Sequence, residues 1–455
     1  MALAGLKSQV SGARGGQPGG LVAKERQRLT VGQVAPDDLQ KRARPSTNRG
    51  LIQFLKGNDT FACAASSASL RSSTGSVVFA SETARRQNSF DEKRTTREGD
   101  ATYDTGKLAS MGIAVGCKKG MKPEAPNQDS YCFIHCPEDF TLYGVFDGHG
   151  ANGHDVSNFC KEMLPKLFLS DPNRVGGGAA GSPANGGASS SASGENGNGT
   201  NGNNANNGQP ANIERAFHDS FRKCQQLLEN EMASSIDSRT SGTTCTMVYW
   251  VQGTKELHVA YCGDSRASVC FREKKGKPPV SGMELTRDHK PEIPEEKRRI
   301  EASGGCVIFD GYYNHRVFKR GTVYPGLNMS RAMGDVIGNR EAGIVETPDY
   351  KCYTLDDSVE AFMLCSDGVW EFISCDEAAQ ICGKFRIKEG SREAANLARI
   401  AGDKGSGTEL GQNKFVGKID AEKAVEDLCR ESYQRWMDDT GGEISDDITA
   451  MIHVL

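Results

Sequence analysis

Aspartates beside tight-turn residues recur along the sequence and could bind cations. Each adjoins a short apolar run typical of a strand, which places the carboxylate at the rim of a sheet. One such aspartate alone is most often a turn or capping residue, but several converging carboxylates repel one another unless cations are present. Because hard divalent ions prefer oxygen ligands, the repetition predicts a Mg²⁺ or Mn²⁺ site. The residues are Asp147 in VFDGHG, Asp264 in YCGDSR, Asp367 in LCSDGVWE, and Asp446 and Asp447 in SDDIT.

The elements that must position these carboxylates are short strands with helices gathered between them. The strand patterns are rich in Val, Tyr, Phe and Thr, whereas the helical patterns repeat apolar residues every three or four positions. This arrangement predicts an α+β fold rather than an alternating parallel sheet. The predicted strands lie within residues 142–148, 243–251, 257–265, 267–271, 362–370 and 446–455, and the helices within 158–169, 213–228, 294–302, 376–386 and 421–437.

Two segments lack the composition of a packed core. Residues 1–104 carry 16 Lys and Arg against 10 Asp and Glu and show no sustained periodicity. We expect a largely disordered basic N-terminal tail there. Residues 172–210 contain eleven Gly and nine Asn but only two charged residues. They predict a flexible insertion that joins two helices without dividing the domain, because loop-closure entropy grows slowly with length.

Composition also excludes several classes of protein. The sequence has no run of about 18 apolar residues, so we expect no membrane span, and its start lacks the apolar core of a secretory signal. Beyond the tail the chain carries 39 basic against 49 acidic residues, which argues against nucleic-acid binding. The 15 cysteines include no C-x-x-C pair and predict reduced thiols in a cytoplasmic or nuclear protein.

In their order along the chain, the motifs resemble those of the metal-dependent serine/threonine protein phosphatases, the PPM or type 2C family. The resemblance implies a four-layer α-β-β-α sandwich of two antiparallel sheets, formed by residues 105–455 and interrupted by 172–210. It further implies hydrolysis of phosphoserine and phosphothreonine in phosphoprotein substrates by a metal-bridging water, in a chain expected to be monomeric. The matching segments are PNQDSY (126–131), VFDGHGANGH (145–154), SGTTCTMV (241–248), CGDSRA (262–267), TRDHKP (286–291), EEKRRIEASGG (295–305), LNMSRAMGD (327–335), CSDGVWE (365–371) and SDDIT (445–449).

The resemblance assigns the metal ligands residue by residue. Asp147 would bridge two divalent ions, and the backbone carbonyl of Gly148 would bind one of them. Asp367 and Asp446 would complete the shell of the second ion. Asp447 stands where the family commonly has Asn, so the choice between Asp446 and Asp447 stays open at this stage.

Other positions receive roles around this pair of ions. Asp129 would hold metal-bound water, and Asp264 with Asp367 or Glu371 would bind a third, weaker ion. His149 matches the proposed general acid, which protonates the poor alkoxide leaving group.

Phosphate recognition departs from the commonest family pattern. Glu124 stands where many members place a phosphate-binding Arg, and Gln128 replaces the usual Glu before Asp129. Because a carboxylate cannot bind phosphate, the cation must come from Lys122 or Arg316, unless the metals alone bind phosphate.

Two rival functions remain beside the phosphatase. A catalytically weak pseudophosphatase would use the same fold as a binding scaffold, but such members lose metal-binding aspartates that this chain keeps. A hydrolase of small phosphorylated metabolites would need an enclosed pocket, which the sequence cannot reveal.

We predict that Lys122→Ala raises the KM for a phosphothreonine peptide by roughly 3- to 10-fold, about 1 kcal/mol, and lowers kcat less. Loss of a cation that binds substrate and transition state equally has this effect. Arg316→Ala should act in the same direction to a lesser degree. Steady-state kinetics on both variants and the double variant measure this, and an unchanged KM in all three would mean that the metals alone bind phosphate.

Overall fold

A computed structural model describes residues 76–80, 95–97, 105–121, 126–136, 140–174, 211–233, 235–251, 253–272, 280–401 and 414–455. All of them belong to one structural unit, residues 41–455. The predictions of a disordered tail and of a flexible insertion concern residues that lie almost entirely outside these ranges.

The larger sheet has nine strands. Seven of them follow the order β15-β8-β7-β5-β4-β1-β2, and two very short strands, β6 and β14, extend the end of β5. All of these pairings are antiparallel. The strands are β1 (Ser76–Ala80), β2 (Thr95–Arg97), β4 (Asp129–Cys136), β5 (Phe140–His149), β6 (Gly242–Thr243), β7 (Cys245–Val251), β8 (Glu256–Cys262), β14 (Met333–Gly334) and β15 (Asp349–Thr354).

The second sheet has five antiparallel strands in the order β10-β9-β16-β17-β3. Its last strand in sequence, β17, is buried along its whole length and lies in the interior of the sheet. The strands are β3 (Ile113–Lys118), β9 (Arg266–Arg272), β10 (Val280–Glu284), β16 (Val359–Cys365) and β17 (Ile448–Val454).

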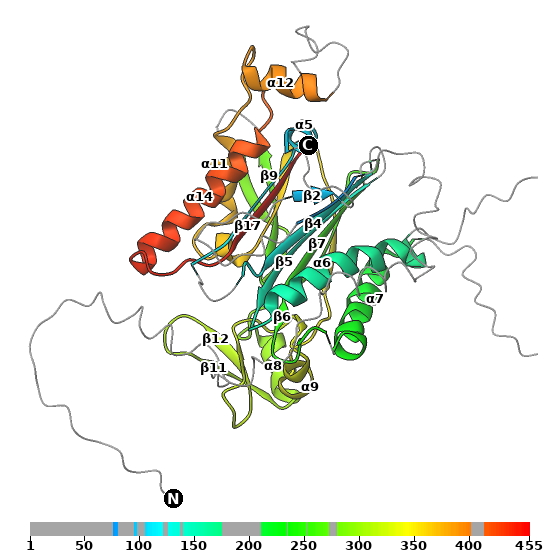
Figure 1. Cartoon of the computed structure of the whole chain (residues 1–455), viewed down its shortest axis with the longest axis vertical. Coiled ribbons are helices and arrows are strands. Elements are labelled where there is room, and N and C mark those ends of the chain that lie inside the picture. The colour runs from blue at the N-terminus through cyan, green and yellow to red at the C-terminus, as the bar shows by residue number, and fades with distance from the viewer. Residues whose placement is uncertain are drawn as a thin grey trace, which may run out of the picture. The chain divides into compact units, whose positions relative to one another are not determined.

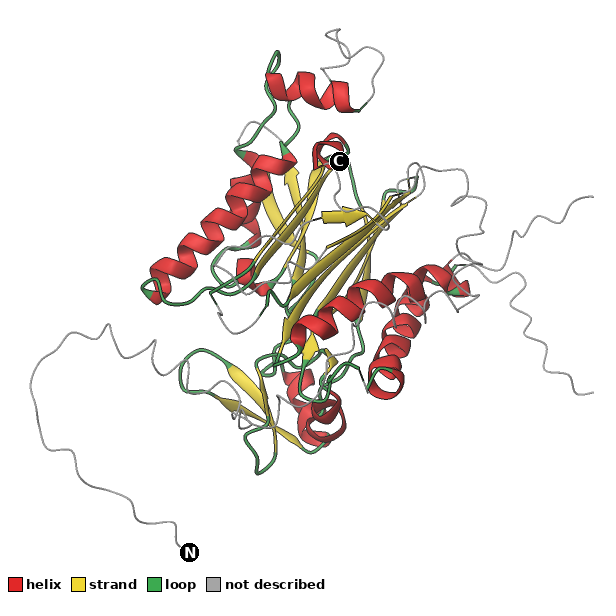
Figure 2. Cartoon of the chain, in the orientation of Figure 1, coloured by secondary structure: helices red, strands yellow, loops and turns green. Residues whose placement is uncertain are grey.

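Helices cover the outer faces of the two sheets, which face each other in the middle (Figures 1 and 2). The long helices α6 and α7 pack on the larger sheet, and α11 and α14 pack on the second. This is the four-layer α-β-β-α sandwich that the resemblance implied. The helices are α5 (Thr105–Ser110), α6 (Gly153–Ser170), α7 (Ile213–Gln226), α10 (Asp367–Trp370), α11 (Cys375–Gly383), α12 (Arg392–Ile400) and α14 (Ala421–Thr440).

The layer between the sheets is an aromatic and aliphatic core. Tyr143 of β5 meets Phe362 of β16 edge to face, with ring centroids 5.2 Å apart. The Tyr143 hydroxyl lies 2.6 Å from Nδ1 of His453 on β17, so its polar atom is satisfied inside the core. These contacts join strands of both sheets and fix one sheet against the other.

A small module lies beyond one end of the sheets, near β6 (Figure 1). It contains a three-stranded antiparallel sheet with its own apolar cluster around Ile300 and Val317. The sequence analysis did not predict its strands, because they are short and half exposed. Its elements are α8 (Pro294–Ala302), β11 (Gly305–Phe309), β12 (His315–Lys319), β13 (Pro325–Leu327) and α9 (Val336–Ala342).

The prediction of an α+β fold is confirmed, and most element boundaries differ from the structure by a few residues. The helix expected within 158–169 begins earlier, at Gly153. It starts directly after the Gly-rich turn that follows β5. Among the described residues, no helix has the length and apolar character needed to cross a bilayer, and no disulfide joins two cysteines.

The ends of the insertion meet in space. The backbone N–H of Asn212, the N-cap of α7, donates to the carbonyl of Asn173 over 2.6 Å. Further along, Phe168 of α6 stacks on Phe217 of α7 with centroids 4.1 Å apart. The two helices are therefore held together independently of the residues between them.

We predict that deleting residues 175–208 changes the melting temperature by less than about 2 °C, below the shift expected for 1 kcal/mol in a domain of this size. A shorter loop between fixed ends costs slightly less closure entropy, so the change should be neutral or upward. Thermal unfolding of the deletion variant and the full chain measures this. A fall of more than about 5 °C would show that the segment packs on the domain.

Candidate active site

The register of β4 and β5 places Asp129 directly opposite Asp147. Cβ atoms of such facing residues lie about 5 Å apart on neighbouring strands. Asp129 is the first residue of β4 and fully buried, whereas Asp147 lies near the end of β5 and is partly exposed. Antiparallel pairing thus brings together two carboxylates from the start of one strand and the end of the next.

The second sheet adds two carboxylates at the same end. Asp367 begins α10 directly after β16, and Asp446 precedes β17, the antiparallel neighbour of β16. Ser366 links the two sheets here: its hydroxyl donates to Oδ2 of Asp129 over 2.7 Å and accepts from the N–H of Thr449 over 3.0 Å. The structure therefore gathers four of the predicted metal ligands into one cluster.

The carboxylates of this cluster perturb one another. Burial and then the charge of Asp447 raise the pKa of Asp129 to about 7. Burial, followed by Asp264 and Asp446, raises the pKa of Asp367 to about 8. Burial and the nearby Asp367 and Asp129 hold the pKa of Asp147 well above its ordinary value. Ionising all of them together is unfavourable unless positive charge enters the cluster.

The donor set fits hard divalent cations. All of the gathered side chains offer carboxylate oxygens, the ligands that Mg²⁺ and Mn²⁺ prefer. Oδ1 of Asp264 is buried and has no hydrogen-bond partner among the described residues, as expected for an oxygen that faces a cation. In the described part of the chain, no group of three or more His, Cys, Asp or Glu side chains stands at metal-binding geometry.

Gly148 is the residue at which the backbone must approach the cluster closely. A Cβ added there would lie 2.4 Å from the carbonyl oxygen of Gly153 and 2.7 Å from that of Gln128. The Gly148 N–H donates to the same Gln128 carbonyl over 3.2 Å. Only glycine fits between the start of α6 and the residue before β4, which keeps its backbone beside Asp147.

The structure distinguishes Asp446 from Asp447. Both carboxylate oxygens of Asp447 accept backbone N–H bonds of 2.7 Å, one from Gly120 and one from Gln128. Asp447 is buried and connects β17 to the segments before β4, whereas Asp446 is partly exposed. This geometry favours Asp446 as the ligand and gives Asp447 a structural role.

His149 has a partner that the sequence analysis missed. Its Nε2 lies 2.6 Å from Oδ2 of Asp335, whose side chain is 2% exposed. Burial alone would lower the pKa of His149, but the Asp335 carboxylate outweighs it and raises that pKa. Asp335 is the last residue of LNMSRAMGD, so the motif contained a signal that could have pointed to it.

Asp264 also has an unpredicted partner. Nζ of Lys290 lies 2.6 Å from its Oδ2, and this charge holds the pKa of Lys290 above its usual range despite burial. Glu371, the proposed alternative ligand for a third ion, is exposed, and its backbone N–H donates to the carbonyl of Asp367 over 2.8 Å. Lys290 belongs to TRDHKP, another segment whose lysine was not singled out.

Of the two predicted phosphate-binding residues, only Arg316 belongs to the described part of the chain. Lys122 lies outside the described residues. Arg316, on β12, donates to Oδ2 of Asp310 over 3.1 Å and to the carbonyl of Gly326 over 2.8 Å. The Arg316 guanidinium is thus hydrogen-bonded within the small module. This geometry does not favour phosphate binding by Arg316, which stays a prediction.

Comparison with known sequences decides the family. The sequence profile of the protein phosphatase 2C family matches residues 117–409. The chain belongs to the protein phosphatase 2C family. It is similar to probable protein phosphatase 2C 12 of Oryza sativa subsp. japonica, with 34% identity over 320 residues, 68% of this chain and 79% of that protein. Probable protein phosphatase 2C 73 of Arabidopsis thaliana is 31% identical over 252 residues, 54% of this chain and 61% of that protein.

Solved structures agree on the fold of this phosphatase 2C. A serine-threonine phosphatase 2C from Toxoplasma gondii superposes with a TM-score of 0.50 at 20% identity, covering 75% of this chain and 93% of that one. The chain is accordingly a serine/threonine protein phosphatase, a class of phosphoric monoester hydrolases that depends on metal ions and acts on phosphoproteins.

In this phosphatase 2C we predict opposite effects for two neighbouring substitutions. Asp447→Asn replaces one acceptor by an amide that faces a backbone N–H, which should cost about 1–3 kcal/mol and lower the melting temperature by several degrees. Asp446→Asn should leave the melting temperature within about 2 °C but abolish activation by Mn²⁺. Thermal unfolding and metal titration of phosphopeptide hydrolysis test the pair. The reverse pattern would make Asp447 the ligand.

Proposed function

We propose that this chain is a competent enzyme that hydrolyses phosphoserine and phosphothreonine in proteins with two divalent cations. The observation that carries the proposal is the convergence of Asp129, Asp147, Asp367 and Asp446 at one end of the two sheets, where burial and neighbouring carboxylates raise the pKa values of the first three. In a binding scaffold without metal ions, apolar or hydrogen-bonded side chains at these positions would give a more stable fold. Uncompensated repulsion among buried carboxylates only destabilises it.

The bound ions would be held by the Asp147 and Asp367 carboxylates, the Asp446 carboxylate and the backbone carbonyl of Gly148. Two divalent ions supply Lewis-acid stabilisation of phosphoryl charge and lower the pKa of water. Asp129, whose Oδ2 accepts a hydrogen bond from the Ser366 hydroxyl, would orient a water molecule beside them.

His149 would protonate the serine or threonine oxygen as it leaves. The Asp335 carboxylate favours the protonated imidazole and fixes the orientation of the ring through Nε2. Nδ1 is buried and has no hydrogen-bond partner among the described residues, so it is the ring nitrogen available to donate a proton. General acid catalysis of this kind contributes roughly 10²–10⁴ in rate.

Asp335 acts as a positioning residue for His149. The backbone of Asp335 adopts a φ of 43°, a left-handed conformation that costs a non-glycine residue energy. Its N–H donates to the Ser241 carbonyl over 2.9 Å, which holds it in that conformation beside His149.

The charges around Asp264 bear on the number of ions. The ammonium of Lys290 lies 2.6 Å from Oδ2 of this carboxylate, so a third cation bound by Asp264 would compete with it. We therefore propose two tightly bound ions, with a third ion binding weakly because it competes with Lys290.

We predict that Asp147→Asn and Asp367→Asn each abolish metal-dependent hydrolysis of a phosphothreonine peptide. The amide fills the same volume but supplies no charge to the cations. In EDTA, the melting temperature of either variant should equal or exceed that of the wild type, because one repelling carboxylate is gone. The assay compares EDTA-stripped protein with protein given Mn²⁺ or Mg²⁺.

Asp357→Asn is the matched control, since that carboxylate is 92% exposed and pairs only with Lys255 among the described residues. It should leave both the rate and the melting temperature unchanged. Hydrolysis within a few-fold of wild type in Asp147→Asn or Asp367→Asn would contradict the proposed site. A wild-type protein that stays inactive with both metals would instead support the scaffold alternative.

A further inference from the structure

A cavity lies at the end of the sheets opposite the carboxylate cluster. Its volume is about 580 Å³, and its walls come from α5, α12, residues 414–421 and the far ends of β4 and β17. On β4, His135 in the cavity wall lies six positions after Asp129. At about 3.3 Å per residue this amounts to about 20 Å, so the cavity is distinct from the active site.

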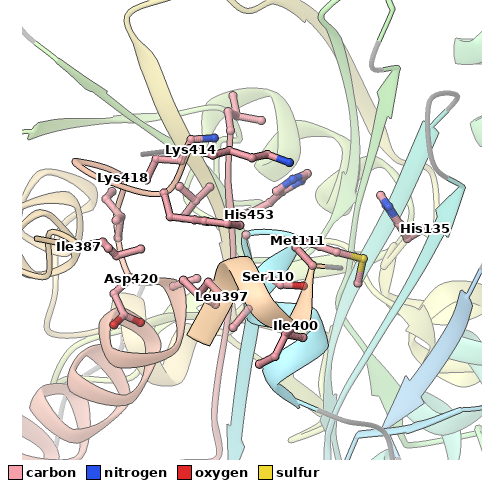
Figure 3. Close-up of a pocket in the computed structure, with 18 of the residues that line it drawn as sticks. Ser110, Met111, His135, Ile387, Leu397, Ile400, Lys414, Lys418, Asp420 and His453 are labelled. Carbon is pink, nitrogen blue, oxygen red and sulfur yellow. The ribbon is translucent and has the colours of Figure 1, made fainter. Parts of the chain in front are cut away.

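Most of the cavity wall is apolar. Leu397 and Ile400 of α12 face it from one side, and Met111, Trp250 and Ile419 complete the apolar surface. Figure 3 shows Leu397 and Ile400 on the opposite side of the cavity from Lys414 and His453. Cavities of this size and lining are typical sites for small organic molecules.

Two ammonium groups border this apolar surface. Lys414 and Lys418 are exposed to solvent, and neither forms an ion pair with another described residue. Partial desolvation at the cavity wall, together with the charge of Lys414, lowers the pKa of Lys418. Asp420 in the same wall accepts the N–H of Lys423 over 3.3 Å and pairs with its Nζ at 3.1 Å, so its charge is already balanced.

The two histidines in the wall add polarity without charge. Burial, followed by the charges of His135 and Lys418, lowers the pKa of His453 to about 3, so its ring is neutral at neutral pH. Its Nδ1 lies 2.6 Å from the Tyr143 hydroxyl, and burial also lowers the pKa of His135. The positive charge of the cavity therefore comes from the two lysines.

These features select the ligand. A dianionic phosphate would favour guanidinium forks, and no arginine lines the cavity among the described residues. The N-terminal segment 1–104 carries six more basic than acidic residues and would be repelled. We propose that the cavity binds an aliphatic monocarboxylate, with its tail against Leu397 and Ile400 and its carboxylate between Lys414 and Lys418.

Isothermal titration calorimetry on the full-length chain tests this directly. The probe is octanoate, compared with octan-1-ol, which has the same tail without the charge, and acetate, which has the charge without the tail. We expect octanoate to bind roughly tenfold or more tightly than either, about 1.4 kcal/mol. Equal affinity for octanoate and octan-1-ol would overturn the proposal. The absence of any heat of binding with octanoate would overturn it as well.

Variants assign the binding to the cavity. Lys414→Ala and Lys418→Ala should each weaken octanoate binding by roughly 3- to 10-fold and leave octan-1-ol unaffected. Lys319→Ala is the matched control, because this lysine pairs with Glu341 in the small module, outside the cavity, and should change nothing. Ile400→Ser should weaken both ligands. Unchanged octanoate affinity in the Lys414→Ala, Lys418→Ala double variant would overturn the site.

Circular dichroism of each variant confirms that it is folded before titration. The experiment measures heat of binding rather than hydrolysis, so its result is independent of the phosphatase mechanism. Failure here would leave the proposed function unaffected.

Discussion

Asp129, Asp147 and Asp367 lie together at one end of two packed sheets, and their mutual repulsion is the constraint on which the rest of the site depends. Like charges held this close raise one another's pKa values and oppose folding unless cations compensate them. The repulsion within the cluster lowers the free energy of unfolding of the metal-free protein. Binding of divalent cations raises it again, so the same arrangement of carboxylates provides both metal affinity and function.

The surrounding structure holds the cluster in place from several directions. Ser366 connects Asp129 to the start of β17, and Asp447 fixes the segment before β4 by accepting two backbone N–H bonds. The role of Ser366 cannot be predicted from a short motif, because Asp129 lies on the other sheet, 237 positions away in the sequence. Oδ2 of Asp335 lies 2.6 Å from Nε2 of His149, and the Asp335 backbone adopts a left-handed conformation.

Much of this could be predicted from the sequence, and the failures have physical causes. The repeated strand-and-aspartate pattern predicted Asp147, Asp264, Asp367 and the Asp446–Asp447 pair, because apolar runs and turn residues are local signals, whereas Asp129 came only from the family resemblance. Asp335 and Lys290 were missed because their roles arise from contacts with residues 186 and 26 positions away. The choice between Asp446 and Asp447 needed the hydrogen-bond partners of each carboxylate, which only the packing of β17 against neighbouring segments supplies.

The central claim is that this carboxylate cluster binds two divalent cations side by side. Electron paramagnetic resonance of the metal-free protein titrated with Mn²⁺ tests it most directly, since neighbouring Mn²⁺ ions interact magnetically. The account predicts that two equivalents bind and that the spectrum of an isolated Mn²⁺ is replaced by that of an interacting pair. A single equivalent with an isolated-ion spectrum, or no binding at all, would contradict it.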